Sequence, residues 1–182
     1  MLTASYAKVN LFLEVLGELP GDYHEIETLL CSVSICDTIK YALTKKQGIK
    51  LWSNLPEMED RDNLVFRMAS YMSERFRPER GLDIYLEKRI PIAAGLGGGS
   101  SNAATTIRAL DQLLGLNLKL RQMEEIAAGF GSDIAFFLHG GAALASNRGE
   151  IVRPLSDIEI DNILLVNPNI AVSSAEAYGM VR

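Results

Sequence analysis

The chain has 182 residues, of which 48% are hydrophobic and 23% are charged. A chain of this size and composition buries enough apolar surface to fold as a globular domain, which excludes a disordered or linker protein. Its 18 basic and 23 acidic residues give a net charge of −5, so we expect neither nucleic acid nor a membrane surface as a partner. A small anionic substrate stays open, because a few backbone amides and cations can bind it.

The cysteines and histidines are few and scattered: Cys31, Cys36, His24 and His139. Their spacing fits no standard zinc site, so we expect no metal held by these side chains. The N-terminus lacks the basic and apolar regions of a secretion signal, and no apolar run is long enough to cross a membrane. We therefore expect a cytoplasmic protein with reduced cysteines.

The first part of the chain predicts a sheet. Residues 6–15 alternate between apolar and polar positions, which predicts a half-buried strand with one core-facing side, formed by Ala7, Val9, Leu11, Leu13 and Val15. Residues 20–22 predict a turn, so Tyr23 and His24 are expected on a loop. Two β-rich stretches follow, at residues 29–43 and 49–53.

The rest of the chain alternates helices with strands. Apolar residues at helical spacing predict helices over residues 63–76, from about 100 to 114, and over 120–128. Strands are predicted at residues 82–86 and 163–166, and a hairpin is predicted around Asn147 to Gly149, flanked by residues 142–145 and 151–152. Ser173 and Glu176 fit a capping box that starts a helix close to Arg182, the last residue. We expect one α+β domain over residues 1–182 whose natural continuation is absent.

A glycine-rich stretch, PIAAGLGGGSSNAA at residues 91–104, connects the predicted strand at 82–86 to a helix. Its glycines let the backbone approach a ligand closely, and the helix N-terminus adds partial positive charge, so the phosphate chain of a nucleotide is the expected ligand. A flexible connection is the alternative. The stretch is not a dinucleotide fingerprint, because Ser100 stands in place of the last glycine, and no lysine follows as in a P-loop.

This stretch resembles the second motif of the GHMP kinases, the family of galactokinase, homoserine kinase and mevalonate kinase. Two more stretches narrow the resemblance: SYAKVNLFLEVLG with PGDYHEIETL near the N-terminus, and GSDIAFF at residues 131–137. The resemblance implies an α+β fold like ribosomal protein S5 domain 2, here an N-terminal ATP-binding domain that a C-terminal domain would follow. It also implies one branch, whose members use ATP with Mg²⁺ to phosphorylate the 2-hydroxyl of 4-diphosphocytidyl-2-C-methyl-D-erythritol for isoprenoid synthesis.

Two residues are catalytic candidates. Lys8 stands on the polar face of its predicted strand, with Asn10 on the same side, and a solvated lysine is the alternative. Asp133 starts an apolar segment, where an aspartate is often only a helix cap. The resemblance implies that Asp133 faces the acceptor hydroxyl and accepts its proton, while Lys8 supports the developing charge.

The resemblance also assigns binding residues. ATP is expected at Pro91, Ile92, Ala93, Ala94, Gly95, Leu96, Gly97, Gly98, Gly99, Ser100 and Ser101, and at Asn63 and Lys88. The cytidine-linked substrate is expected at Asn10, Tyr23, His24 and Tyr178. Asn63 could instead be a helix cap, Lys88 a solvated strand lysine and Tyr178 a packing residue. No residue identifies itself as a Mg²⁺ ligand.

Two other functions stay open. Another GHMP kinase, with homoserine or mevalonate as acceptor, is the nearer one, although Tyr23 and His24 suit a nucleobase better. The second is a nucleotide-binding module without catalysis, because the chain lacks the expected C-terminal domain.

Overall fold

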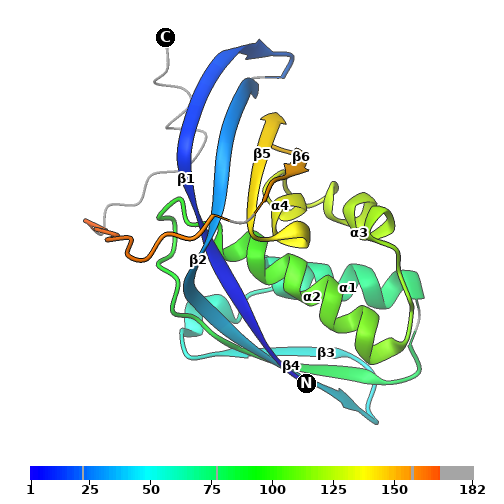
Figure 1. The fold of residues 1–182 in the computed structure, drawn as a ribbon. Helices are drawn as coiled ribbons and strands as arrows, with labels where there is room; N and C mark the ends of the chain where they lie inside the picture. Colours follow the sequence, from blue (N-terminus) through cyan, green and yellow to red (C-terminus); the bar gives the residue numbers. More distant parts are fainter. Residues whose placement is uncertain (22, 77, 157, 169–182) are drawn as a thin grey trace.

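A computed structural model describes residues 1–168, apart from residues 22, 77 and 157. Six strands form one sheet in the order β3-β4-β2-β5-β6, with β1 paired to β2, and the helices lie together on one side of it (Figure 1). The strands are β1 (Leu2–Leu19), β2 (Tyr23–Thr44), β3 (Ile49–Ser53), β4 (Gly81–Glu87), β5 (Ala142–Asn147) and β6 (Ile151–Pro154). The helices are α1 (Leu64–Phe76), α2 (Gly98–Leu114), α3 (Leu120–Ala127) and α4 (Ile134–His139), with a short 3-10 turn at Pro56–Met58.

The main core lies between the sheet and the helices, and all four helices contribute buried side chains to it. The predicted helix over residues 63–76 is confirmed as α1, and the side chains that it buries are Val65, Met68, Ala69 and Met72. The second predicted helix is also confirmed, and α2 ends where predicted, at Gly115 with a φ of 63°. The predicted hairpin is formed by β5 and β6, with Ser146 opposite Ile151. Apolar spacing therefore places most elements correctly.

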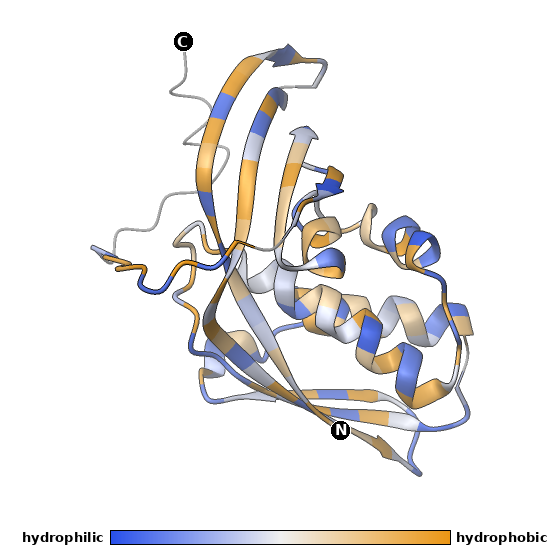
Figure 2. Cartoon of the chain, viewed as in Figure 1, coloured by the Kyte–Doolittle hydropathy of each residue, from blue (hydrophilic) through white to orange (hydrophobic). Residues whose placement is uncertain are grey.

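The long β1–β2 hairpin departs from the predicted alternation. Ala7 and Lys8 are neighbours in the chain and both are buried, beside a register shift between Tyr6 and Ala7. Leu11 and Leu13, predicted to face the core, are 42% and 44% exposed. The hairpin extends past the helices, as Figure 1 shows, so its apolar bands in Figure 2 have no helix over them. Alternation predicts the two faces of a strand but not which face another element covers.

Three other expectations concern the organisation of the chain. The buried strand at residues 163–166 is wrong: that stretch has no strand structure, and Leu164 and Val166 are 87% and 81% exposed. An apolar run becomes a buried strand only where a sheet edge and a covering layer receive it. The capping box at Ser173 and Glu176 lies outside the described residues. Within the described part of the chain, no helix combines the length and the apolar character needed to cross a membrane.

A buried tyrosine gives the core a pH-dependent stability. Burial raises the pKa of the Tyr41 phenol above its ordinary value of 10.0, an effect that its hydrogen bond to Thr106 partly opposes. The unfolded chain loses this proton first, so Tyr41 contributes stability below about pH 10 that is lost as the pH rises further. We expect Tyr41→Phe to cost about 1 kcal/mol at neutral pH and to flatten the loss of stability between about pH 9 and 11. Urea unfolding measures both; exposed Tyr85→Phe is the control, and an equally steep loss in Tyr41→Phe would contradict the assignment.

Candidate active site

The structure brings the two predicted catalytic residues together from distant parts of the chain. Lys8 lies on β1, and Asp133 immediately precedes α4. The Lys8 Nζ is 3.7 Å from the Asp133 Oδ2, and the two side chains are 9% and 41% exposed. The alternative interpretation, a solvated lysine, is therefore wrong, because the Lys8 side chain is buried. Its ammonium group lies next to the Asp133 carboxylate, which is partly open to solvent.

A chain of hydrogen bonds orients the lysine. The Lys8 Nζ donates to the Asn10 Oδ1 at 2.6 Å, and the Asn10 Nδ2 donates to the Thr28 Oγ1 at 2.8 Å. The Thr28 hydroxyl in turn donates to the Phe12 carbonyl at 2.6 Å. Because each polar group has its partner, the ammonium is held in one place beside Asp133. Thr28 was not singled out from the sequence.

The aspartate occupies a helix cap position without capping. Asp133 is the residue at the start of α4, yet its side chain makes no hydrogen bond to the first turn of that helix. Its carboxylate instead lies near Lys8 and has one oxygen close to the β5–β6 turn, 3.8 Å from where a Cβ on Gly149 would lie. The geometry therefore favours a proton-accepting or charge-stabilising role over the capping role.

The glycine-rich stretch forms a loop followed directly by a helix. Gly95 and Gly97 have φ angles of 71° and 67°, which glycine adopts without steric cost. Helix α2 starts at Gly98, so the stretch from Gly98 onward is helical, although the sequence predicted a loop up to about Ser100. Gly97 supplies no side-chain cap, and the first N–H groups of a helix have no acceptor within it. These amides are the donors that a phosphate group needs.

The glycine-rich loop is packed against β1, the strand that carries Lys8. The Lys8 N–H donates to the Leu96 carbonyl at 3.0 Å. A Cβ on Gly97 would lie 2.6 Å from the Phe137 Cζ and 3.1 Å from the Lys8 Cγ. The start of α2 and the Lys8 side chain therefore lie close together, and Gly97 allows this packing because it has no side chain.

Three predicted ATP-binding residues use their side chains within the protein. Ser101 is buried, with its Oγ 2.7 Å from the Ser5 Oγ. Asn63 acts as a cap, because its Oδ1 accepts the Val65 N–H at 2.9 Å. Lys88 is buried and is not a solvated strand lysine, since its Nζ lies 2.5 Å from the Asp37 Oδ2. Contacts of these residues with a nucleotide would have to come from the backbone or from remaining hydrogen-bonding positions.

Tyr23 and His24 begin strand β2 and are not on a loop, which corrects the expectation. The pairing of β1 with β2 continues to Leu19 and Tyr23, the residues that flank the predicted turn, so the strand begins directly after the turn and leaves no loop there. The Tyr23 ring is exposed and the Arg148 guanidinium lies 4.5 Å from its centre. Arg148 was predicted only as a turn residue. Since its neighbour Gly149 lies next to Asp133, the β5–β6 turn contacts both the Tyr23 ring and the predicted catalytic residue Asp133. Tyr178 lies outside the described residues.

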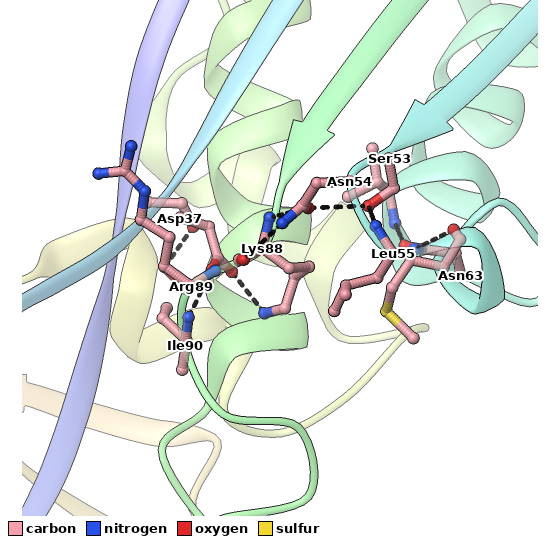
Figure 3. Close-up of polar contacts among 12 residues, drawn as sticks. Asp37, Ser53, Asn54, Leu55, Asn63, Lys88, Arg89 and Ile90 are labelled. Carbon is pink, nitrogen blue, oxygen red and sulfur yellow. Dashed lines mark hydrogen bonds and ion pairs between the residues drawn. The ribbon is translucent and has the colours of Figure 1, made fainter.

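Residues that hold the base of the loop were also missed in the sequence, above all Asp37 and Asn54 (Figure 3). One signal was available for Asp37, which stands within an apolar β-rich stretch, where a charged residue has to be paired. Among the described residues, no group of three or more His, Cys, Asp and Glu side chains is arranged to hold a metal ion. A cavity of about 290 Å³ lies beside β3, lined in part by Trp52 and Phe66, and it includes none of the predicted site residues.

The fold and this arrangement define a class of protein. Residues 63–141 match the family model described as the GHMP kinases N terminal domain. Over this stretch the chain matches the GHMP kinases, and its α+β fold is that of their N-terminal domain. A solved mevalonate kinase has this fold too, with a TM-score of 0.65 at 19% identity over 86% of this chain and 56% of that one.

Named relatives narrow the class. A 4-diphosphocytidyl-2-C-methyl-D-erythritol kinase of Synechococcus sp. (strain JA-3-3Ab) is 42% identical over 97% of this chain and 57% of its own length. A protein of the same name from Bacillus cereus (strain AH187) is 36% identical over 100% of this chain and 63% of its own. A solved 4-(cytidine 5'-diphospho)-2C-methyl-D-erythritol kinase is 37% identical with a TM-score of 0.75, over 85% of this chain and 55% of that one. The chain thus spans less than two thirds of each.

Proposed function

We propose that this chain is the N-terminal domain of an ATP-dependent kinase that phosphorylates the 2-hydroxyl of 4-diphosphocytidyl-2-C-methyl-D-erythritol. The observation that carries the proposal is the Lys8–Asp133 pair, set beside a glycine-rich loop that leads into α2, whose first N–H groups have no acceptor within the helix and no side-chain cap. The relatives named for this reaction support it over nearly the whole chain. Both cysteines are free thiols, which agrees with a reducing cytoplasm as the location that we propose.

The reaction needs positioning and electrostatic support more than covalent help. The acceptor oxygen attacks the γ-phosphorus of ATP, the bond from that phosphorus to the β-γ bridging oxygen breaks, and ADP leaves. Asp133 accepts the hydroxyl proton. Lys8 stabilises the ionised form of Asp133 before the reaction and the negative charge that develops on the reacting oxygens during it. Mg²⁺ would screen the triphosphate. Because the described residues offer it no acidic cluster, we assign no step to protein-bound metal.

The binding roles follow the same division. The loop from Pro91 to Ser101 would hold the triphosphate through its amides, with Asn63 and Lys88 near the adenine. Asn10, Tyr23 and His24 would bind the cytidine-linked substrate, with Tyr178 as a second aromatic. An exposed tyrosine ring beside a cation suits a stacked base next to a diphosphate, which favours this acceptor over homoserine or mevalonate.

Binding to this chain tests the acceptor. We expect CDP to bind more tightly than UDP, and His24→Ala to remove that preference, because an imidazole edge that hydrogen-bonds the cytosine distinguishes the two bases. One lost hydrogen bond predicts a change of about tenfold in the CDP affinity. Calorimetric titration measures both ligands.

His139→Ala is the matched control, because it is the other histidine of the chain and pairs with Glu124. It should leave the ratio of the CDP and UDP affinities unchanged. Equal affinities for CDP and UDP in the unmodified chain would overturn the cytidine acceptor and favour another GHMP kinase.

A further inference from the structure

A buried carboxylate holds the chain where it leaves β4 for the glycine-rich loop. Asp37, on β2, is fully buried. Its Oδ2 lies 2.5 Å from the Lys88 Nζ, and its Oδ1 accepts the N–H groups of Arg89 and Ile90 at 2.7 and 2.8 Å (Figure 3). A buried carboxylate is costly unless charge and hydrogen bonds compensate it. The sequence therefore keeps this group in the core together with three donors from consecutive residues.

The register of the sheet explains why the carboxylate is needed. Strands β2 and β4 pair up to Thr38 and Glu87, and Asp37 is the next residue along β2. On its other side, Asp37 stands opposite Ser5 of β1. At this point β4 ends, so the N–H groups that follow lose the ladder that would have paired them. The Asp37 side chain replaces the ladder and directs the chain out of the sheet, toward the loop.

The Asn54 side chain, just after the end of β3, also binds the backbone of Lys88. The Asn54 Oδ1 accepts the Lys88 N–H at 2.7 Å, and the Asn54 Nδ2 donates to the Lys88 carbonyl at 3.1 Å (Figure 3). Both backbone groups of Lys88 are thus bonded to one amide, and its ammonium is bonded to Asp37. Lys88 is held at three points on two sides, which leaves it little freedom.

The held residues pack directly under the start of α2. A Cβ on Gly98 would lie 3.0 Å from the Lys88 Nζ and 3.0 Å from the Ile90 Cγ2. The loop between Ile90 and Gly98 is therefore supported at both ends by the same short segment. If that segment shifts, the loop and the free amides of α2 shift with it.

We propose that Asp37 is the positioning residue of the glycine-rich loop, and that it acts with Asn54 through Lys88, Arg89 and Ile90 to arrange the loop before the phosphate chain binds. The inference rests on the proposed function in one respect, that the loop binds a nucleotide. It assigns Lys88 a supporting role under the helix, because its ammonium already has a buried carboxylate partner.

The test compares two variants of this chain with a matched control. Asp37→Asn keeps an oxygen for the two N–H groups but removes the charge that pairs with Lys88. Asn54→Ala removes the two hydrogen bonds to the Lys88 backbone at an exposed residue, so it is expected to fold even if Asp37→Asn does not. Glu87→Gln removes a carboxylate from the same strand end, where it pairs with the exposed Arg89 side chain.

Three readouts separate positioning from general stability: calorimetric titration with a non-hydrolysable ATP analogue, titration with CDP, and backbone amide exchange. We expect Asp37→Asn to weaken the analogue about tenfold and Asn54→Ala about threefold, with the CDP affinity changed less than about twofold in both. The amides of Arg89 and Ile90 should exchange at least about tenfold faster in Asp37→Asn, because they lose a charged acceptor. Glu87→Gln should match the unmodified chain in all three.

Each contrary result has a definite meaning. The inference would be overturned if the folded Asp37→Asn chain bound the ATP analogue as tightly as the unmodified chain. If Asp37→Asn does not fold, the same result in Asn54→Ala would overturn it. So would an equal loss of analogue and CDP affinity, which marks a structural role alone. If the unmodified chain binds no analogue, the proposed function fails instead; the exchange rates of Arg89 and Ile90 need no nucleotide and then decide whether Asp37 anchors the loop.

Discussion

Replacing Asp133 by Asn in the complete kinase is expected to lower kcat by about 100- to 10,000-fold, the range for loss of a positioned proton acceptor. The amide preserves the shape of the side chain but cannot accept the hydroxyl proton, and it removes the negative partner 3.7 Å from the Lys8 ammonium. The Asp133 side chain is 41% exposed and caps no helix, so the fold should be unaffected. Turnover with ATP and the cytidine-linked substrate measures the effect.

Two comparisons make this result specific. Asp83→Asn is the same substitution at a different place, on β4, where Asp83 lies opposite Ala42 of β2 and Lys50 of β3. It should leave turnover unchanged. The affinities of Asp133→Asn for CDP and for the ATP analogue should stay within about twofold, because the missing group acts on the reacting atoms and not on the base or the phosphates. Near-normal turnover in Asp133→Asn would show that another group accepts the proton.

Replacing Gly97 by Ala is expected to lower the free energy of unfolding by about 2–4 kcal/mol, from the positive φ and the overpacking together. Gly97 has a φ of 67°, and its added methyl group would lie 2.6 Å from the Phe137 ring and 3.1 Å from the Lys8 side chain. To accept it, the Phe137 ring or the Lys8 side chain has to move, and a shift of the Lys8 side chain would change its position relative to Asp133. Urea denaturation measures the stability, and turnover of the complete kinase should fall as well.

A neighbouring glycine provides the control. Gly99 lies in the first turn of α2, and a Cβ there would meet only the Leu64 Cδ1, at an ordinary contact distance of 3.5 Å. Because alanine favours a helix over glycine by up to about 1 kcal/mol, Gly99→Ala should keep or raise the stability. Equal destabilisation by the two substitutions would show that the contacts around Gly97 do not decide its identity.

The sequence by itself determined the elements whose pattern is local. Helical spacing placed α1 and α2, and Asn147 to Gly149 placed the β5–β6 hairpin, because periodicity and turn chemistry depend on residues close in the chain. The motif around Gly95 to Gly99 and the motifs around Lys8 and Asp133 indicated the family and the candidate residues. That assignment came from resemblance, since spacing alone does not bring residues 8 and 133 together.

Only the tertiary structure decided what covers each of these elements. It left Leu11 and Leu164 42% and 87% exposed where apolar patterning predicted burial. It buried Lys8 and Lys88, each beside a carboxylate that is far away in the sequence, Asp133 for the first and Asp37 for the second. The physical reason is the same throughout: burial and ion pairing depend on contacts between distant segments, and those contacts follow from sheet register and helix packing, which no local pattern contains.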